Sequence, residues 1–340
     1  MNILDSVRKN VMKWRQKILL IEITPVTNRA YDCLLTPIVT ICSWLKRDFQ
    51  LMFAETWNFT FRQNTLQETI RYGERIAYND GDWVSLLERY HGVKLNLCRG
   101  ITENEAHEQI ITELNASRPV IVFFQSYWCP WSPDFKKEEQ DGPHYFMISG
   151  FDGVNYICID GIYLNSPVIL SRNYFKRGFK GTYATFRLKL EEDIVPCPYK
   201  QIIKSAADGF ILSETPRQIG LFAREISHSF NIKAEGEKYI INAPLIRNLE
   251  GIARGRMKFG IFLRYVGERY GAEKLMTVSD EFMSIGNSWA AIQRMFIKMW
   301  FAPATQSSVL KKIVDELFRL ADQEEKVAME LRENLANTGN

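Results

Sequence analysis

Apolar runs of strand length are concentrated between residues 93 and 190. Pro119–Gln125 is apolar up to its last residue, which is typical of a buried central strand. His144–Asp160 holds two alternating apolar segments around Asp152-Gly153, a dipeptide that favours a two-residue hairpin turn. Two further strands are predicted at Val93–Leu97 and Tyr183–Leu190.

Helical segments are predicted before and between these strands. Apolar residues are dense from Tyr31 to Phe53, and Pro37 lies inside that run. Proline is tolerated in the first turn of a helix, so we expect this helix to begin within two or three residues of Cys33. Thr102-Glu-Asn-Glu105 is a capping box. The other predicted segments are a short basic helix before an apolar stretch at Ile18–Ile23, then helices at Leu66–Tyr72, Asp82–His91 and Thr102–Ala116.

Helical periodicity dominates after Val195-Pro-Cys-Pro198. The last helix has the amphipathic spacing of a long surface helix. We therefore predict a domain boundary near residues 195–210, with one domain at 1–200 and an all-α domain at 201–340. A helix at the front and several strands after it indicate an α+β first domain. The predicted C-terminal helices are Gln218–Phe230, Ala243–Tyr270, Ser279–Trp300 and Val309–Leu335.

Composition excludes several classes of function. The chain has 340 residues with 43 basic and 40 acidic side chains, a balance that implies no nucleic-acid partner. No apolar run reaches the length of a membrane span, and Met1–Lys17 is followed by no signal-peptide core. The six cysteines form no CxxC or comparable metal-ligand spacing. We expect no metal, reduced thiols and a cytoplasmic protein.

His144 and Asp160 carry the first sign of chemistry. They stand at the two open ends of the predicted hairpin, where neighbouring strands bring their side chains together. A carboxylate in that position can orient an imidazole. This is half of a catalytic triad, and it requires a nucleophile.

Cys33 is the candidate nucleophile because it lies at the predicted start of an apolar helix. Amides at a helix N-terminus favour a thiolate, and a nearby imidazolium favours it further. The chain order Cys, His, Asp is that of papain-like proteins, in which the cysteine heads a central helix and the histidine lies on a facing sheet. We therefore predict Cys33 as nucleophile, His144 as base and acid, and Asp160 as the group that orients His144.

Each of these residues also has a structural interpretation. A cysteine on an apolar helix is most often core packing, and an aspartate before glycine is most often a turn residue. Cys129 is a competing thiol, but Pro130 follows it and no helix start lies behind it, so a place in the cleft wall suits it better. Three placements that agree with one geometry favour the triad.

The surroundings of the site are less specified. Tyr127, Trp128 and Trp131 could line a substrate cleft with Cys129, although aromatic loop residues more often close a core. Asn28 and the backbone N–H of Cys33 are candidate oxyanion donors.

The same residues resemble those of a known family. They resemble the N-terminal domain of the butirosin-biosynthesis acyltransferase family, whose proteins have a papain-like fold. The C-terminal residues resemble the helical domain that accompanies it, so the likeness covers about residues 25–335. One departure is Leu34-Leu35, which is bulky where related processing peptidases usually carry glycine. The motifs are Asp32-Cys33, His144-Tyr145, Gly150-Phe-Asp152, Ile159-Asp160, Ser284-Ile-Gly-Asn-Ser-Trp-Ala-Ala-Ile-Gln293 and Leu320-Ala-Asp-Gln-Glu-Glu325.

The resemblance implies transfer of an acyl group from the phosphopantetheine thioester of a carrier protein to a small-molecule or peptide amine. It also implies a role in nonribosomal-peptide or aminoglycoside-like antibiotic biosynthesis, with no bound cofactor. A noncatalytic accessory protein of such an assembly line is the alternative, and a cysteine peptidase or cyclase is a third. The oligomeric state stays open, a homodimer through the helical domain being one option.

Overall fold

The computed structural model describes residues 19–63, 71–137, 142–236 and 239–336. Met1–Lys17 and all but the end of the predicted helix Leu66–Tyr72 lie outside these residues. The chain divides into two compact units. The first comprises Met1–Phe49 and His91–Ile194, and the second comprises Gln50–Tyr90 and Val195–Asn340.

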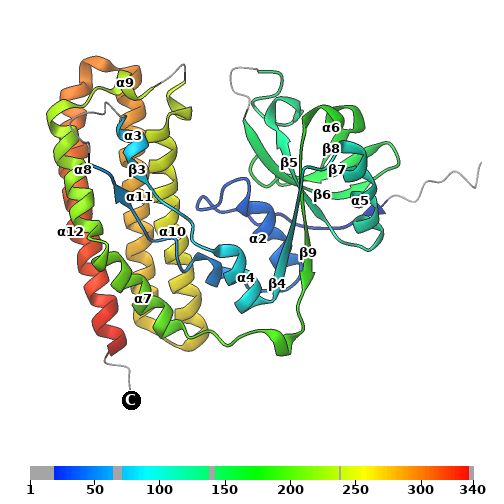
Figure 1. Cartoon of the computed structure of the whole chain (residues 1–340), viewed down its shortest axis with the longest axis horizontal. Coiled ribbons are helices and arrows are strands. Elements are labelled where there is room, and N and C mark those ends of the chain that lie inside the picture. Colours follow the sequence, from blue (N-terminus) through cyan, green and yellow to red (C-terminus); the bar gives the residue numbers. More distant parts are fainter. Residues whose placement is uncertain (1–18, 64–70, 138–141, 237–238, 337–340) are drawn as a thin grey trace, which may run out of the picture. The chain divides into compact units, whose positions relative to one another are not determined.

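An antiparallel sheet of seven strands forms the centre of the first unit (Figure 1). Its order is β4-β9-β5-β6-β7-β8, and β1 pairs with the end of β6. The predicted buried run is strand β5, which lies between β9 and β6. The strands are β1 Leu19–Leu20, β4 Val93–Arg99, β5 Val120–Gln125, β6 Pro143–Phe151, β7 Asn155–Ile159, β8 Val168–Ser171 and β9 Phe179–Leu188.

Helices pack against this sheet. Helix α5 (Glu103–Asn115) begins with the predicted capping box, in which Thr102 and Glu105 bond reciprocally. Helix α2 (Leu35–Trp44) begins two residues after Cys33, as expected, but ends before the predicted Phe53 because the chain turns at Lys46, where φ is 55°. Helix α6 (Arg172–Gly178) and strand β8 were not predicted. The unit is therefore α+β, with a buried aromatic and aliphatic core around Phe124, Phe146 and Phe175.

The second unit is a helical bundle in which α10 packs along α11, and α12 packs along α7, α8 and α11 (Figure 1). None of its described helices, nor any in the first unit, is long and apolar enough to cross a membrane. Helix α7 was missed by the sequence pattern. The elements are η1 Gln50–Phe53, β2 Thr60–Phe61, α3 Tyr72–Arg75, β3 Ile76–Ala77, α4 Trp83–His91, α7 Tyr199–Leu212, α8 Thr215–Ser229, α9 Ile232–Glu235, α10 Pro244–Tyr270, α11 Glu273–Phe301 and α12 Gln306–Ala336.

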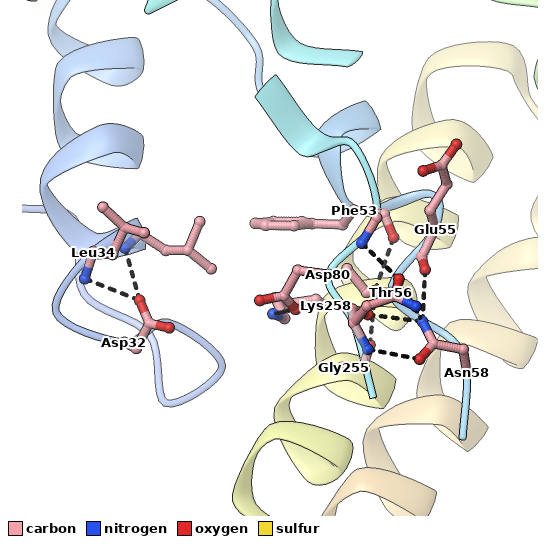
Figure 2. Close-up of polar contacts among 12 residues, drawn as sticks. Asp32, Leu34, Phe53, Glu55, Thr56, Asn58, Asp80, Gly255 and Lys258 are labelled. Carbon is pink, nitrogen blue, oxygen red and sulfur yellow. Dashed lines mark hydrogen bonds and ion pairs between the residues drawn. The ribbon is translucent and has the colours of Figure 1, made fainter. Parts of the chain in front are cut away.

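Residues 50–90 belong to this bundle, whereas the predicted limits placed them in the first domain. Aromatic side chains explain the difference, because Phe59 and Trp57 are almost fully buried among helix residues. Phe59 lies 5.7 Å from Trp289, measured between ring centroids. Polar contacts also join the segment to α10. The Thr56 hydroxyl donates to the Gly255 carbonyl at 2.9 Å, and Asp80 forms an ion pair with Lys258 (Figure 2).

A buried carboxylate joins this segment to three helices. Glu324 of α12 accepts the indole N–H of Trp57 at 2.8 Å and that of Trp289 at 2.7 Å. It also pairs with Arg256 at 2.9 Å, and both charged side chains are fully buried. Arg256 donates in addition to the Asn58 carbonyl at 2.6 Å. Every partner of this network is hydrogen-bonded, which is the condition under which a buried ion pair is tolerated.

We expect Glu324→Gln to lower the free energy of unfolding by about 3–5 kcal/mol, because it leaves the buried Arg256 charge without a carboxylate. Urea denaturation measures this loss. The matched control is Glu316→Gln on the same helix, which breaks a partly exposed pair with Arg319 and should change stability by about 1 kcal/mol or less. Equal effects of the two variants would contradict a role for the network in stability.

Candidate functional site

His144 and Asp160 are in direct contact inside the first unit. Nε2 of His144 lies 2.5 Å from Oδ2 of Asp160. Both residues are buried, with 3% and 2% of their surface exposed. The predicted pairing of these two residues is therefore present, and it lies in a region from which water is largely excluded.

A β-bulge puts the two side chains on one face of the sheet. Near the turn, Phe151 pairs with Tyr156, but beyond the register shift between Ile148 and Gly150, Met147 pairs with Ile159. Continuing this second register sets Asp160 opposite Phe146, two residues from His144 and on the same face. Without the shift, Asp160 would stand opposite Met147 and point away from His144. Because a one-residue slip reverses every side chain, the bulge is required for the pair.

The bulged segment also contacts the start of the described chain. Leu19 and Leu20 of strand β1 pair with Phe151 and Gly150, and the carbonyl of Ser149 accepts the backbone N–H of Ile21 at 2.8 Å. A Cβ atom at Gly150 would lie 2.4 Å from the carbonyl oxygen of Leu19, so only glycine permits this approach. The predicted turn is also corrected. Its centre is Gly153-Val154, one residue later than expected, because Asp152 N bonds to Asn155 O at 3.1 Å.

Cys33 lies just ahead of α2, half-buried, and close enough to His144 to raise the pKa of its imidazole. Since Asp160 occupies Nε2 of the imidazole, Nδ1 is the nitrogen left for other partners. Asp32 Oδ1 accepts the backbone N–H groups of Leu34 at 2.9 Å and Leu35 at 2.8 Å (Figure 2). We expected these amides to favour a thiolate at Cys33, but they donate their hydrogen bonds to Asp32. His144 is then the main group that can stabilise a negative charge on Cys33.

The environment raises the pKa of His144 to about 9. Burial is the largest influence and acts in the opposite direction, because it disfavours the charged imidazolium. The hydrogen bond that His144 donates to Asp160, together with the negative charges of Asp160 and Cys33, outweighs burial. The imidazolium form of His144 is therefore favoured at neutral pH. That form places a proton donor beside Cys33.

Trp131 has a different place from the one expected. Its indole N–H donates to Oδ2 of Asp160 at 2.8 Å, and its ring packs edge-on against Phe146. The backbone N–H of Ile162 donates to Oδ1 of Asp160 at 3.1 Å. Both carboxylate oxygens are thus fixed, and with them the orientation of His144. Trp131 is a positioning residue for the pair.

The other aromatic candidates lie in the loop after β5. Trp128 packs against Tyr174 and lies under the guanidinium of Arg177. Tyr127 contacts Trp128 edge-on, with 4.8 Å between ring centroids. Cys129 is fully buried, and burial raises the pKa of its thiol well above the usual range. A buried thiol of that kind is unreactive, so Cys129 is a core residue.

Oxyanion donors are only partly defined. Oδ1 of Asn28 accepts the backbone N–H of Ala30 at 2.9 Å, which makes the side chain part of a local turn on an exposed loop. The backbone N–H of Cys33 stays the second candidate. Tyr163 was not singled out from the sequence: its ring lies 5.1 Å from that of His144, and burial raises the pKa of its hydroxyl. Its only sequence signal is the position three residues after Asp160.

No protein-family model matches this chain, and no curated protein is a significant match to it. The resemblance to the butirosin-biosynthesis acyltransferase family therefore stays a prediction from the motifs. Among residues 19–63, 71–137, 142–236 and 239–336, no cluster of three His, Cys, Asp or Glu side chains could hold a metal ion.

We expect Asp160→Asn to lower the pKa of His144 from about 9, because the charge that raises it is removed while burial, which lowers it, remains. Proton NMR of the imidazole C–H signals measures this, and the chain has only 4 histidines to assign. Asp193→Asn, an exposed carboxylate of the same unit, is the matched control and should leave the midpoint unchanged. A His144 titration that does not move in Asp160→Asn would show that this carboxylate does not set its charge.

Proposed function

We propose that the first unit is a thiol enzyme that transfers or hydrolyses acyl groups through Cys33. In this proposal the α+β unit has the papain-like arrangement, with Cys33 at the start of the central helix α2 and His144 on the facing sheet. Cys33 is the nucleophile, His144 is the general base and then the general acid, and Asp160 fixes the imidazole.

The reaction has two steps. In the first, the Cys33 thiol gives its proton to the neutral form of His144, which becomes the imidazolium, and the thiolate attacks the thioester carbonyl carbon. The carbon–sulfur bond of the donor breaks, and its thiolate takes the proton from the His144 imidazolium. In the second step, an amine or water gives a proton to His144 and attacks the acyl-cysteine. The Cys33–carbon bond breaks and Cys33 regains a proton from His144.

The observation that carries the proposal is that the imidazole bonded to Asp160 also lies close enough to Cys33 for that residue to raise its pKa. A noncatalytic accessory protein would need no such contact, and a fully buried thiol would favour it. Cys33 is instead half-buried, whereas Cys129 and Cys158 are fully buried. Among the described thiols, Cys33 is the one that is both accessible and beside a base.

The donor and acceptor follow from the resemblance alone. They are a carrier-protein phosphopantetheine thioester and an amine on a small molecule or peptide. A thioester is an activated acyl group, so the modest set of donors around Cys33 is adequate for it. A peptidase or cyclase would use the same three residues on a less activated amide, and substrate profiling separates these reactions.

We expect acyl N-acetylcysteamine thioesters, which mimic the phosphopantetheine end, to add one acyl group to Cys33. Intact-mass spectrometry of short aliphatic and aminoacyl thioesters measures the adduct. His144→Gln should slow its formation by about 10²-fold or more, because general acid–base catalysis contributes about 10²–10⁴-fold. Cys33→Ala should abolish the adduct.

Cys98→Ala is the matched control, because Cys98 is another half-buried thiol of the same unit. It should acylate at the wild-type rate. A protein that forms no adduct with any thioester of the panel, or a Cys33→Ala variant that is acylated as fast as the wild type, would refute the proposal.

A further inference from the structure

The second unit contains a cavity that the proposed chemistry at Cys33 does not use. Its volume is about 550 Å³, and every residue that lines it belongs to Gln50–Tyr90 or Val195–Asn340. It lies between helix α7, helix α4 and the segment that contains Trp57. Cavities of about 300–1,000 Å³ are those in which proteins hold small molecules.

Aromatic rings form part of the cavity wall. Trp57 stacks on Phe210, with 4.2 Å between ring centroids and 20° between ring planes. Trp57 cannot turn freely, because its indole N–H is held by the buried Glu324. A rigid apolar wall of this kind is ready to receive a flat or chain-like apolar group without rearrangement.

Small residues on α7 leave the space open. Ser205 and Gly209 of α7 and Ser213, its C-cap residue, are spaced four apart, and all three line the cavity. Glycine is unfavourable inside a helix, and packing does not demand it here, since a Cβ at Gly209 would meet no heavy atom within 4 Å. A larger side chain at this position would therefore enter the cavity rather than disturb the bundle.

One cation stands at the cavity without a carboxylate partner. Arg89 of α4 is exposed, lines the cavity and forms no ion pair with any described residue. Its guanidinium lies over the ring of Tyr90, 5.3 Å from the centroid. Glu55 also lines the cavity, and its Oε2 accepts the backbone N–H of Asp82 at 2.8 Å. Arg89 is the one cationic side chain among the described lining residues, and guanidinium groups are well suited to carboxylates and phosphates.

We propose that this cavity binds a small amphiphilic anion, with its apolar body against Trp57 and Phe210 and its carboxylate, sulfonate or phosphate at Arg89. The site is independent of Cys33. It gives the helical unit a ligand of its own, of the size and chemistry of an aryl or medium-chain acyl acid.

Two fluorescent probes test the site on the full chain. The anionic probe is 8-anilinonaphthalene-1-sulfonate, and the uncharged one is N-phenyl-1-naphthylamine. We expect both to bind the wild type saturably at one site. Arg89→Gln should weaken binding of the anionic probe at least fivefold and leave the uncharged probe unchanged. Arg224→Gln, an exposed arginine of the same unit away from the cavity, is the matched control and should change neither.

The second test of the site fills the cavity with a larger side chain. Gly209→Phe should abolish binding of both probes, and Gly209→Ala should retain it with a raised Tm, because alanine favours the helix. If Gly209→Phe does not fold, Ser205→Leu on the same face replaces it. Cys33→Ala should bind both probes as the wild type does, which separates this proposal from the one for the thiol. Absence of saturable binding to the wild type, or full binding by a folded Gly209→Phe variant, would overturn it.

Discussion

The irregularity in strand β6 is the constraint on which the candidate site depends. A regular hairpin would put His144 and Asp160 on opposite faces of the sheet, and the shift between Ile148 and Gly150 brings them onto one. Residues 19–21 pack on the same stretch, since the Ser149 carbonyl accepts the backbone N–H of Ile21 and the Leu19 carbonyl leaves no room for a Cβ at Gly150. The shift therefore lies where a segment more than a hundred positions earlier in the chain contacts the hairpin.

The charge arrangement follows from that geometry. A buried imidazole would ordinarily lose its proton, but here the neighbouring carboxylate and thiol keep it charged. The carboxylate can do this only because Trp131 and Ile162 hold both of its oxygens in place. Each step is needed for the next: the bulge sets the face, the face permits the contact, and the contact maintains the imidazolium beside Cys33.

The three candidate residues of the site are easier to predict from the sequence than the features that hold them in position. Cys33, His144 and Asp160 could be predicted because helix starts and hairpin ends have local signatures. The bulge could not, since an alternating apolar pattern does not show a shift of register, and Trp131 could not, since an indole donor has no spacing rule. Residues 50–90 were expected in the first domain for a similar reason. Their helices look ordinary in the sequence, and only the burial of Trp57 and Phe59 assigns them to the bundle.

The two units contain the same kind of polar contact with different partners. Each buries a carboxylate that accepts indole N–H groups: Asp160 from Trp131, and Glu324 from Trp57 and Trp289. The remaining partner decides the outcome. Glu324 faces the guanidinium of Arg256. Guanidinium groups do not exchange protons in the way that imidazoles do, so that pair holds helices together. Asp160 faces an imidazole, which can give up its proton to a neighbour. The same kind of buried carboxylate is structural beside a permanent cation and permits proton transfer beside a titratable one.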